Sequence, residues 1–133
     1  MVEFKNLKVW QRAMDFAEAV YGVTKNFPND EKFALVGQLK RAVVSVFSNI
    51  AEGCRRNTDK ELISFLYNAR GSCGEVEAQL IFAGRVGYVD DKKVKKLVGE
   101  CDEISKMISG YIKYLRDKIS KDIKTRSNKK EYA

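Results

Sequence analysis

The chain has 133 residues, a single proline, 44% hydrophobic residues and a formal net charge of +7. That length suits one compact domain built around one core. The absence of histidine argues against dimetal centres that use Glu-x-x-His motifs and against hydrolytic triads with a histidine base, and the positive charge favours a polyanion or an anionic surface as the partner.

Apolar residues recur at three- and four-residue spacing from the N-terminus onward, as in amphipathic helices. The first such stripe runs from Trp10 to Tyr21, and the helix is predicted to end near Phe27-Pro28. A second helix is predicted from an N-cap at Asn29 or Asp30 to Gly53, with the same periodicity. Both segments are therefore predicted to present one apolar face to a common core.

Two N-terminal capping signals define the rest of the predicted bundle. The stretch Thr58-Asp59-Lys60-Glu61 has the form of a capping box and predicts a third helix, which Gly84 or Gly87 would end. Asp90 is the predicted N-cap of a fourth helix, whose stripe from Val94 to Leu115 stays close to a seven-residue repeat. Because the connections are short, residues 1–119 are predicted to form an all-α, antiparallel up-down-up-down four-helix bundle.

The apolar pattern stops after Ile119. Residues 120–133, SKDIKTRSNKKEYA, contain five basic and two acidic side chains. The sequence therefore predicts a basic, partly disordered C-terminal tail, which is either a solvated terminus or a flexible arm that adds phosphate contacts.

Cys54, Cys73 and Cys101 are odd in number, widely spaced and without a CxxC motif. They predict neither a disulfide framework nor a zinc site, and we interpret them as small core residues of a cytosolic protein. The N-terminus has no charged segment followed by an apolar run, and no apolar stretch approaches the ~20 residues that span a bilayer. We expect a cytoplasmic protein with no membrane association, no metal and no cofactor.

Polar residues form a second stripe beside the apolar one on the second and third predicted helices. These stripes are rich in Ser, Asn and Gln, and such side chains are better suited to packed hydrogen bonds than to a solvated helix face. They would lie between the two helices, at a subunit interface or in solvent. Gly71 and Gly74, each unfavourable in a helix, indicate close approach by another backbone or a partner. The predicted polar network consists of Gln38, Arg41, Ser45, Asn49, Glu52, Ser72 and Glu75.

Three long strings carry a family resemblance. FKNLKVWQRA at 4–13, QLKRAVVSVFSNIAEG at 38–53 and FLYNARGSCGEVEAQL at 65–80 resemble the four-helix-bundle family of 23S rRNA intervening-sequence proteins. That family is similar to the accessory variability determinant proteins of diversity-generating retroelements. The chain departs from the family pattern at Phe47, where proline is expected, at Phe33-Ala34-Leu35, where FGL is common, and at Lys40, where arginine is usual.

The resemblance implies a bacterial homo-oligomer, a homopentameric ring or barrel, with a basic surface suited to nucleic acid and without an established activity. In a ring, symmetry repeats every basic residue, so a moderate charge per chain becomes a field that can hold a phosphate backbone. We predict a non-enzymatic protein that binds RNA or DNA with little sequence specificity. The candidate contact residues are Lys40, Arg55, Arg56, Arg70, Arg85, Lys92, Lys93, Lys95, Lys96, Lys121, Lys124, Arg126, Lys129 and Lys130.

The alternative is a scaffold or accessory subunit that binds a protein partner and no nucleic acid. Its candidate interface anchors are Trp10, Tyr21, Tyr67 and Tyr88. An enzyme is not predicted, because the available glutamates, such as Glu61, are accompanied by no histidine, nucleophile elbow, phosphate loop or metal constellation.

Overall fold

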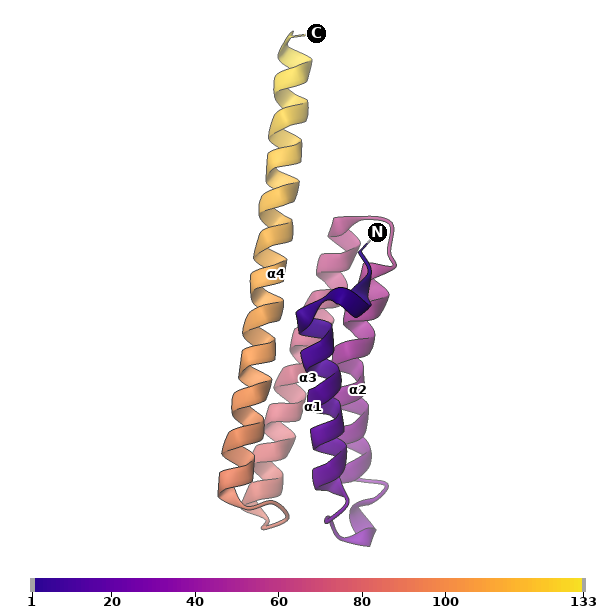
Figure 1. Ribbon diagram of the computed structural model, residues 1–133, viewed down its shortest axis with the longest axis vertical. Helices are drawn as coiled ribbons and strands as arrows, with labels where there is room; N and C mark the ends of the chain where they lie inside the picture. The colour runs from indigo at the N-terminus through magenta and orange to yellow at the C-terminus, as the bar shows by residue number, and fades with distance from the viewer. Residues whose placement is uncertain (1, 133) are drawn as a thin grey trace.

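The fold is an all-α four-helix bundle, described by a computed structural model for residues 2–132, with side chains as far as residue 129. Successive helices run in alternating directions, and α4 continues well beyond the end of the other three (Figure 1). The elements are the 3₁₀ helix η1 (Phe4–Asn6), α1 (Lys8–Thr24), the 3₁₀ helix η2 (Asn29–Glu31), α2 (Leu35–Cys54), α3 (Asp59–Arg85) and α4 (Asp91–Tyr132).

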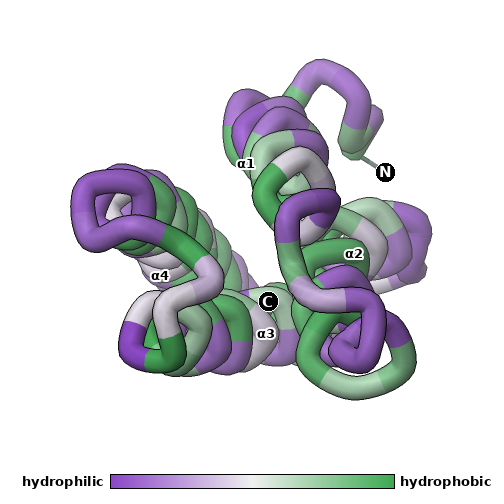
Figure 2. Tube along the Cα trace, turned by 90° about the horizontal axis from the view of Figure 1, so that it is seen from below, coloured by the Kyte–Doolittle hydropathy of each residue, from purple (hydrophilic) through white to green (hydrophobic). Residues whose placement is uncertain are grey.

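The core lies along the bundle axis, and α3 has the most extensive packing. α3 packs on α2 and α4, whereas α1 completes the bundle through a larger contact with α2 and a smaller one with α4. In the end-on view the apolar positions of the four helices turn towards one another (Figure 2). Leu39, Ile50, Leu66 and Ile108 have no exposed surface. Burial of these apolar faces is the main source of the stability of such a bundle.

The predicted N-caps of α3 and α4 are confirmed. The Thr58 Oγ1 atom accepts a hydrogen bond from the backbone N–H of Glu61 at 3.1 Å, and the Asp90 Oδ1 atom accepts one from the N–H of Lys93 at 2.8 Å. Gly87 occupies the left-handed region with φ of 83°, which suits glycine because it has no Cβ. This conformation ends α3 and turns the chain into α4.

The prediction that Asn29 or Asp30 caps the second helix is wrong. These residues belong to η2, and α2 begins only at Leu35 after Ala34, which makes no side-chain capping bond. The N–H groups of Glu31 and Lys32 donate to the carbonyls of Pro28 and Asn29 inside the 3₁₀ turn. The N–H groups that an Asn29 or Asp30 side chain would cap are therefore already used inside the turn, and α2 begins several residues later.

The predicted end of the fourth helix at Ile119 is also wrong, because α4 continues through the expected tail to Tyr132. The apolar stripe that carried the periodic signal stops there, but the segment has no Gly or Pro and is rich in Lys and Arg, which favour helix. Residues 120–129 are all exposed. We call residues 120–129 the extension; it stands free of α1–α3 (Figure 1). No helix within 2–132 is long and apolar enough to span a membrane.

Candidate nucleic-acid interface

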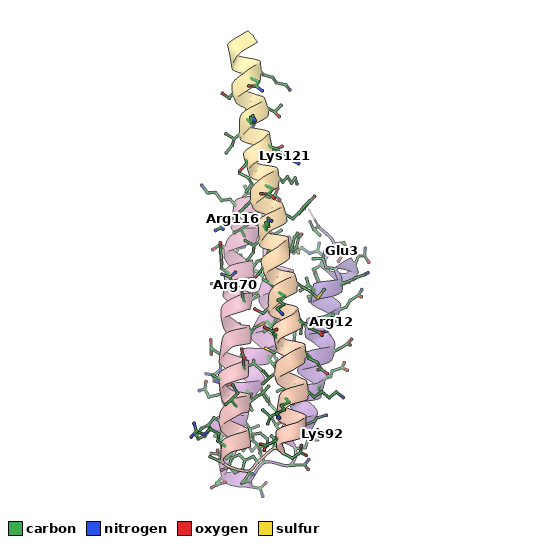
Figure 3. All side chains as sticks on the ribbon, turned by 90° about the vertical axis from the view of Figure 1, so that its left-hand side faces the viewer. Glu3, Arg12, Arg70, Lys92, Arg116 and Lys121 are labelled. Atoms are coloured by element: carbon green, nitrogen blue, oxygen red, sulfur yellow. The ribbon has the colours of Figure 1, made fainter. Side chains whose placement is uncertain are left out.

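Most of the predicted contact residues lie in three separate places on the molecule. Lys92 lies at one end of the bundle, and Lys121 lies beyond the other end, where the extension begins (Figure 3). Helix α3 alone spans roughly 40 Å between these ends, given a rise of 1.5 Å per residue. The structure therefore does not bring all of the predicted residues into one patch on a single copy of the chain.

The first cluster, the α4-start cluster, consists of Lys92, Lys93, Lys95 and Lys96, with Arg85 at the preceding end of α3. All of these side chains are exposed except Lys93, which is half-buried. Within the described residues none of them forms an ion pair. Positive charge in the first turns of a helix opposes the helix dipole. The cluster is therefore charged and mostly accessible, and its cations form no ion pair with any described side chain, although Asp90 and Asp91 precede its lysines in the sequence.

The second cluster, the α2–α3 corner, holds Arg55 and Arg56. Arg55 pairs with Glu3 at 3.5 Å, and Arg56 pairs with Glu52 at 2.9 Å. Both arginines also lie over phenylalanine rings, those of Phe4 and Phe65, at 5.2 and 4.6 Å from the centroids. These ion pairs are half exposed, and such pairs contribute only about 0–1 kcal/mol, so a phosphate can compete for the arginines.

The third cluster is the extension itself, with Lys121, Lys124, Arg126 and Lys129 all exposed. The Lys118 Nζ atom, near its base, contacts the Asp59 carboxylate at 3.1 Å. Asp59 is the first residue of α3, so this ion pair places the base of the extension beside the α2–α3 corner. The side chain of Lys130 lies outside the described part of the chain.

Lys40 and Arg70 lie apart from these clusters. The Lys40 Nζ atom is 4.7 Å from the centroid of the Tyr21 ring on α1. Arg70 contacts the Tyr67 ring and donates to the Ser109 hydroxyl of α4. Arg116, which the sequence did not single out, contacts the same Tyr67 ring from α4. Nothing in the sequence links positions 67 and 116, because only the packing of α3 on α4 brings them together.

Three members of the predicted polar network are connected across the α2–α3 interface. The Asn49 amide Nδ2 donates to the carbonyl and the hydroxyl of Ser45 at 2.8 and 2.9 Å, and the Ser72 hydroxyl donates to the Ser45 hydroxyl at 2.9 Å. Ser72 is only 6% exposed. The other four members are exposed: Glu52 pairs with Arg56 instead, and Gln38, Arg41 and Glu75 do not join the cluster.

The glycines of α3 fall into two kinds. A Cβ at Gly84 would lie 2.8 Å from Val94 Cγ2 of α4, so this glycine permits close helix packing. A Cβ at Gly71 or Gly74 would meet nothing within 4 Å, and both residues are exposed. No atom of the described residues outside the helix's own backbone lies within 4 Å of a Cβ at these positions, so close packing within the subunit does not explain Gly71 and Gly74.

An apolar groove lies between α1 and α2, and other exposed apolar side chains lie at the C-terminal end of α3, at Ile81, Phe82 and Val86. This groove has a volume of about 400 Å³, and its lining includes Met14, Tyr21, Val44 and Phe47. Phe33, in the preceding loop, is 92% exposed. The other aromatic candidates are half-buried: Trp10 packs edge-on against Phe4, Tyr88 packs against Phe27, and Tyr67 lies between α3 and α4.

The three cysteines are buried and free. The Cys101 thiol donates to the Cys73 carbonyl at 3.2 Å. Its interaction with Cys73 and its burial raise the pKa of Cys101, and burial raises the pKa of Cys54, so both thiols disfavour the nucleophilic thiolate. Among the side chains described, residues 2–129, no group of three or more Cys, Asp or Glu could hold a metal ion.

Comparisons with known proteins agree with this architecture. A family model described as 23S rRNA-intervening sequence protein matches residues 5–110. The structure of a protein of unknown function from the S23 ribosomal protein family of Bacteroides thetaiotaomicron VPI-5482 is similar, with a TM-score of 0.71 and 23% identity over 79% of this chain and 98% of that one. No curated protein sequence matches the chain. The likeness to the retroelement proteins stays a prediction.

Proposed function

Since the chain belongs to the family of 23S rRNA-intervening sequence proteins, we propose that it is a non-enzymatic, oligomeric protein that binds RNA or DNA through its basic surface with little sequence specificity. The proposal includes a location in the bacterial cytoplasm. Residues 1–119 would provide the bundle domain, and residues 120–133 a basic C-terminal tail.

The observation that carries the proposal is the α4-start cluster together with the extension. Both present exposed cations that form no ion pair within the described residues. Carboxylates do occur at four-residue spacing, as at Asp91 before Lys95 and Asp122 before Arg126, but among the described side chains they form no ion pair with these cations. The cations are therefore free to contact phosphates, and no base-reading element accompanies them, which argues for backbone contacts rather than sequence readout.

Assembly would make the separated clusters effective. We propose a homopentameric ring, in which five copies of each cluster lie along one nucleic-acid path. The part-buried Ser45–Ser72 bond would hold the packing of α2 on α3 that shapes each subunit for the ring, because polar groups packed between helices specify register where apolar contacts tolerate slippage. The mass in solution tests this directly, with five times the 15.2 kDa of one chain expected.

Binding is tested by fluorescence anisotropy of short labelled RNA and DNA at about 50 and 200 mM salt, with the oligomer mass measured on the same sample. If six or more phosphates are contacted, affinity should fall by roughly 10³-fold or more between these salt concentrations, with little difference between sequences. No binding at the lower salt concentration would refute the proposal.

Charge-removal variants locate the contacts. Lys92, Lys95 and Lys96 changed together to Gln, and Lys121, Lys124, Arg126 and Lys129 changed together to Gln, should each weaken binding and flatten its salt dependence. Lys106→Gln is the matched control, because the Lys106 ammonium is already paired with Asp102 at 3.1 Å. If the control weakens binding as much per charge as the cluster variants do, the clusters are not the binding surface.

The α1–α2 groove and the exposed Phe33 favour the second candidate function, a scaffold that binds a protein partner. A largely apolar complex would withstand the rise in salt that dissociates nucleic acid. This alternative would be favoured if the chain formed a complex with a protein partner at 200 mM salt, lost that complex on Phe47→Asp, and bound no nucleic acid at 50 mM salt.

A further inference from the structure

We propose that Tyr67, Arg70 and Arg116 form a phosphate clamp across α3 and α4, in which two guanidiniums mounted on one tyrosine ring bind phosphate groups of a nucleic-acid backbone. This inference rests on the proposed function, since it specifies one of the places where the basic surface would contact its ligand. It adds Ser109 and Arg116 to the residues that the sequence had indicated, and it assigns Tyr67, a candidate anchor for a protein partner, to nucleic-acid contact.

The geometry of the clamp comes from two different helices. The Arg70 guanidinium carbon lies 4.9 Å from the centroid of the Tyr67 ring, and that of Arg116 lies 5.2 Å from the same centroid. The Arg70 Nη1 atom also donates to the Ser109 hydroxyl at 3.2 Å, which fixes this side chain against α4. Arg70 and Arg116 extend from neighbouring helices (Figure 3). The ring therefore holds two cationic forks in defined positions.

The two charges are close and are not neutralised by the chain. Because both lie near one ring centroid, the two guanidinium carbons are at most about 10 Å apart, within one Debye length at about 0.1 M salt. Neither arginine forms an ion pair within the described residues. Lys113, one turn before Arg116 and also exposed, adds a third positive charge. Like charges held this close repel each other, and a bound anion reduces the repulsion.

Three other surface arginines of the bundle are ion-paired, whereas Arg41 and Arg85 have no ion pair within the described residues but share no aromatic ring with a second cation. Arg12 pairs with Glu103, Arg55 with Glu3 and Arg56 with Glu52. If Arg70 and Arg116 only covered the tyrosine ring, one cation would suffice, and a neighbouring carboxylate would be an advantage. Two unneutralised forks at one site match the bidentate recognition of phosphate oxygens, for which arginine is better suited than lysine.

The test follows the arginine Nε–Hε NMR resonances during titration of the full-length protein with sodium phosphate, with sodium chloride at equal ionic strength, and with a short single-stranded RNA. The Arg70 and Arg116 resonances should move with phosphate and with RNA but not with chloride, while Arg12, held by Glu103, serves as the internal reference. In parallel, Arg70→Gln and Arg116→Gln should each weaken RNA binding about tenfold, the effect of losing one charge-assisted contact, whereas Arg12→Gln should change it less than twofold.

Each outcome is decisive for the clamp. Movement of both resonances with phosphate and RNA supports it, and movement with RNA alone supports it with the strand backbone as the source of the phosphate. No movement with either ligand overturns it. If wild-type protein binds RNA but the two variants bind as well as Arg12→Gln does, the clamp is wrong and the proposed function stands. If phosphate moves both resonances while RNA does not bind, the clamp stands and the proposed function falls.

Discussion

Replacing Gly71 and Gly74 by alanine distinguishes a free face of α3 from one that a partner covers. Both glycines lie inside α3, where glycine costs about 1 kcal/mol relative to alanine, and a Cβ at either position would meet no atom of this chain within 4 Å. For the isolated subunit the double variant should therefore gain about 2 kcal/mol in the free energy of unfolding. The added methyl groups would, however, obstruct any backbone that approaches this face from outside.

The gain is large enough to measure. For a chain of this length, about 2 kcal/mol corresponds to a rise in Tm of roughly 6 to 10 °C and to a shift of about 1 M in the urea midpoint. Unfolding should be followed over a range of protein concentrations, because assembly adds a concentration-dependent contribution to stability. Light scattering after gel filtration gives the mass of the same samples.

Gly84→Ala is the matched control in the same helix. There the new Cβ would lie 2.8 Å from Val94 Cγ2, and overpacking of a bundle contact costs about 1–3 kcal/mol. The propensity gain of about 1 kcal/mol offsets part of this cost. We therefore expect Gly84→Ala to lower the free energy of unfolding by up to about 2 kcal/mol while Gly71→Ala and Gly74→Ala raise it.

The two α3 variants separate the explanations for their glycines. A more stable subunit with a reduced oligomer mass would show that Gly71 and Gly74 are kept for contact with another copy. A more stable subunit with unchanged mass would place the assembly interface elsewhere. A double variant that is less stable than wild type, with unchanged mass, would refute the reasoning that this face of α3 is open.

Three further substitutions or reactions test the local structure. Thr58→Ala should lower the free energy of unfolding by about 1 kcal/mol, because the Glu61 N–H loses its capping partner, while Thr58→Ser should be close to neutral; equal urea midpoints for the two would count against the cap. Ser45→Ala should lower the free energy of unfolding by about 1–3 kcal/mol, since it leaves the buried Ser72 hydroxyl without its acceptor. Ser72→Ala should lower it less, and a lower Tm for Ser72→Ala than for Ser45→Ala would contradict this. The thiols of Cys54, Cys73 and Cys101 should react with Ellman's reagent only after unfolding, because all three are buried; rapid reaction of the native protein would contradict this.

Sequence periodicity predicted the number of helices and their core faces because each helix buries one apolar stripe. Thr58 and Asp90 indicated two helix starts because their side chains form local capping hydrogen bonds. The end of α4 was not predictable in this way. Beyond Ile119 the helix has no core to face, so the stripe disappears while helix propensity persists. At η2, Asn29 had the composition of a cap, but Pro28 begins a 3₁₀ turn that is satisfied internally.

The candidate site was less accessible to sequence reasoning because its contacts cross helices. The Ser45–Asn49 pair is visible as a four-residue spacing, but its link to Ser72 depends on the register of α2 against α3. Arg116 meets Tyr67 only through the packing of α3 on α4, and no local pattern encodes that pairing. The individual basic residues could be named from the sequence, whereas their neutralisation by Glu3 or Glu52 could not.

The proposed clamp and the open glycine face adjoin each other on α3, and this adjacency has a consequence for assembly. Gly74 lies four residues after Arg70, one turn further along the same side of the helix. If a second copy packs over Gly71 and Gly74, its surface approaches the unneutralised Arg70 and Arg116, and their repulsion opposes the contact unless an anion occupies the clamp. Linkage then requires that phosphate or nucleic acid promote assembly and that assembly tighten anion binding by the same factor.

The oligomer mass at fixed protein concentration should therefore rise when phosphate replaces chloride at equal ionic strength, and this response should be lost in Arg116→Gln but retained in Arg12→Gln. Equal masses in both salts, for a wild type that dissociates in the measured concentration range, would show that the two sites act independently.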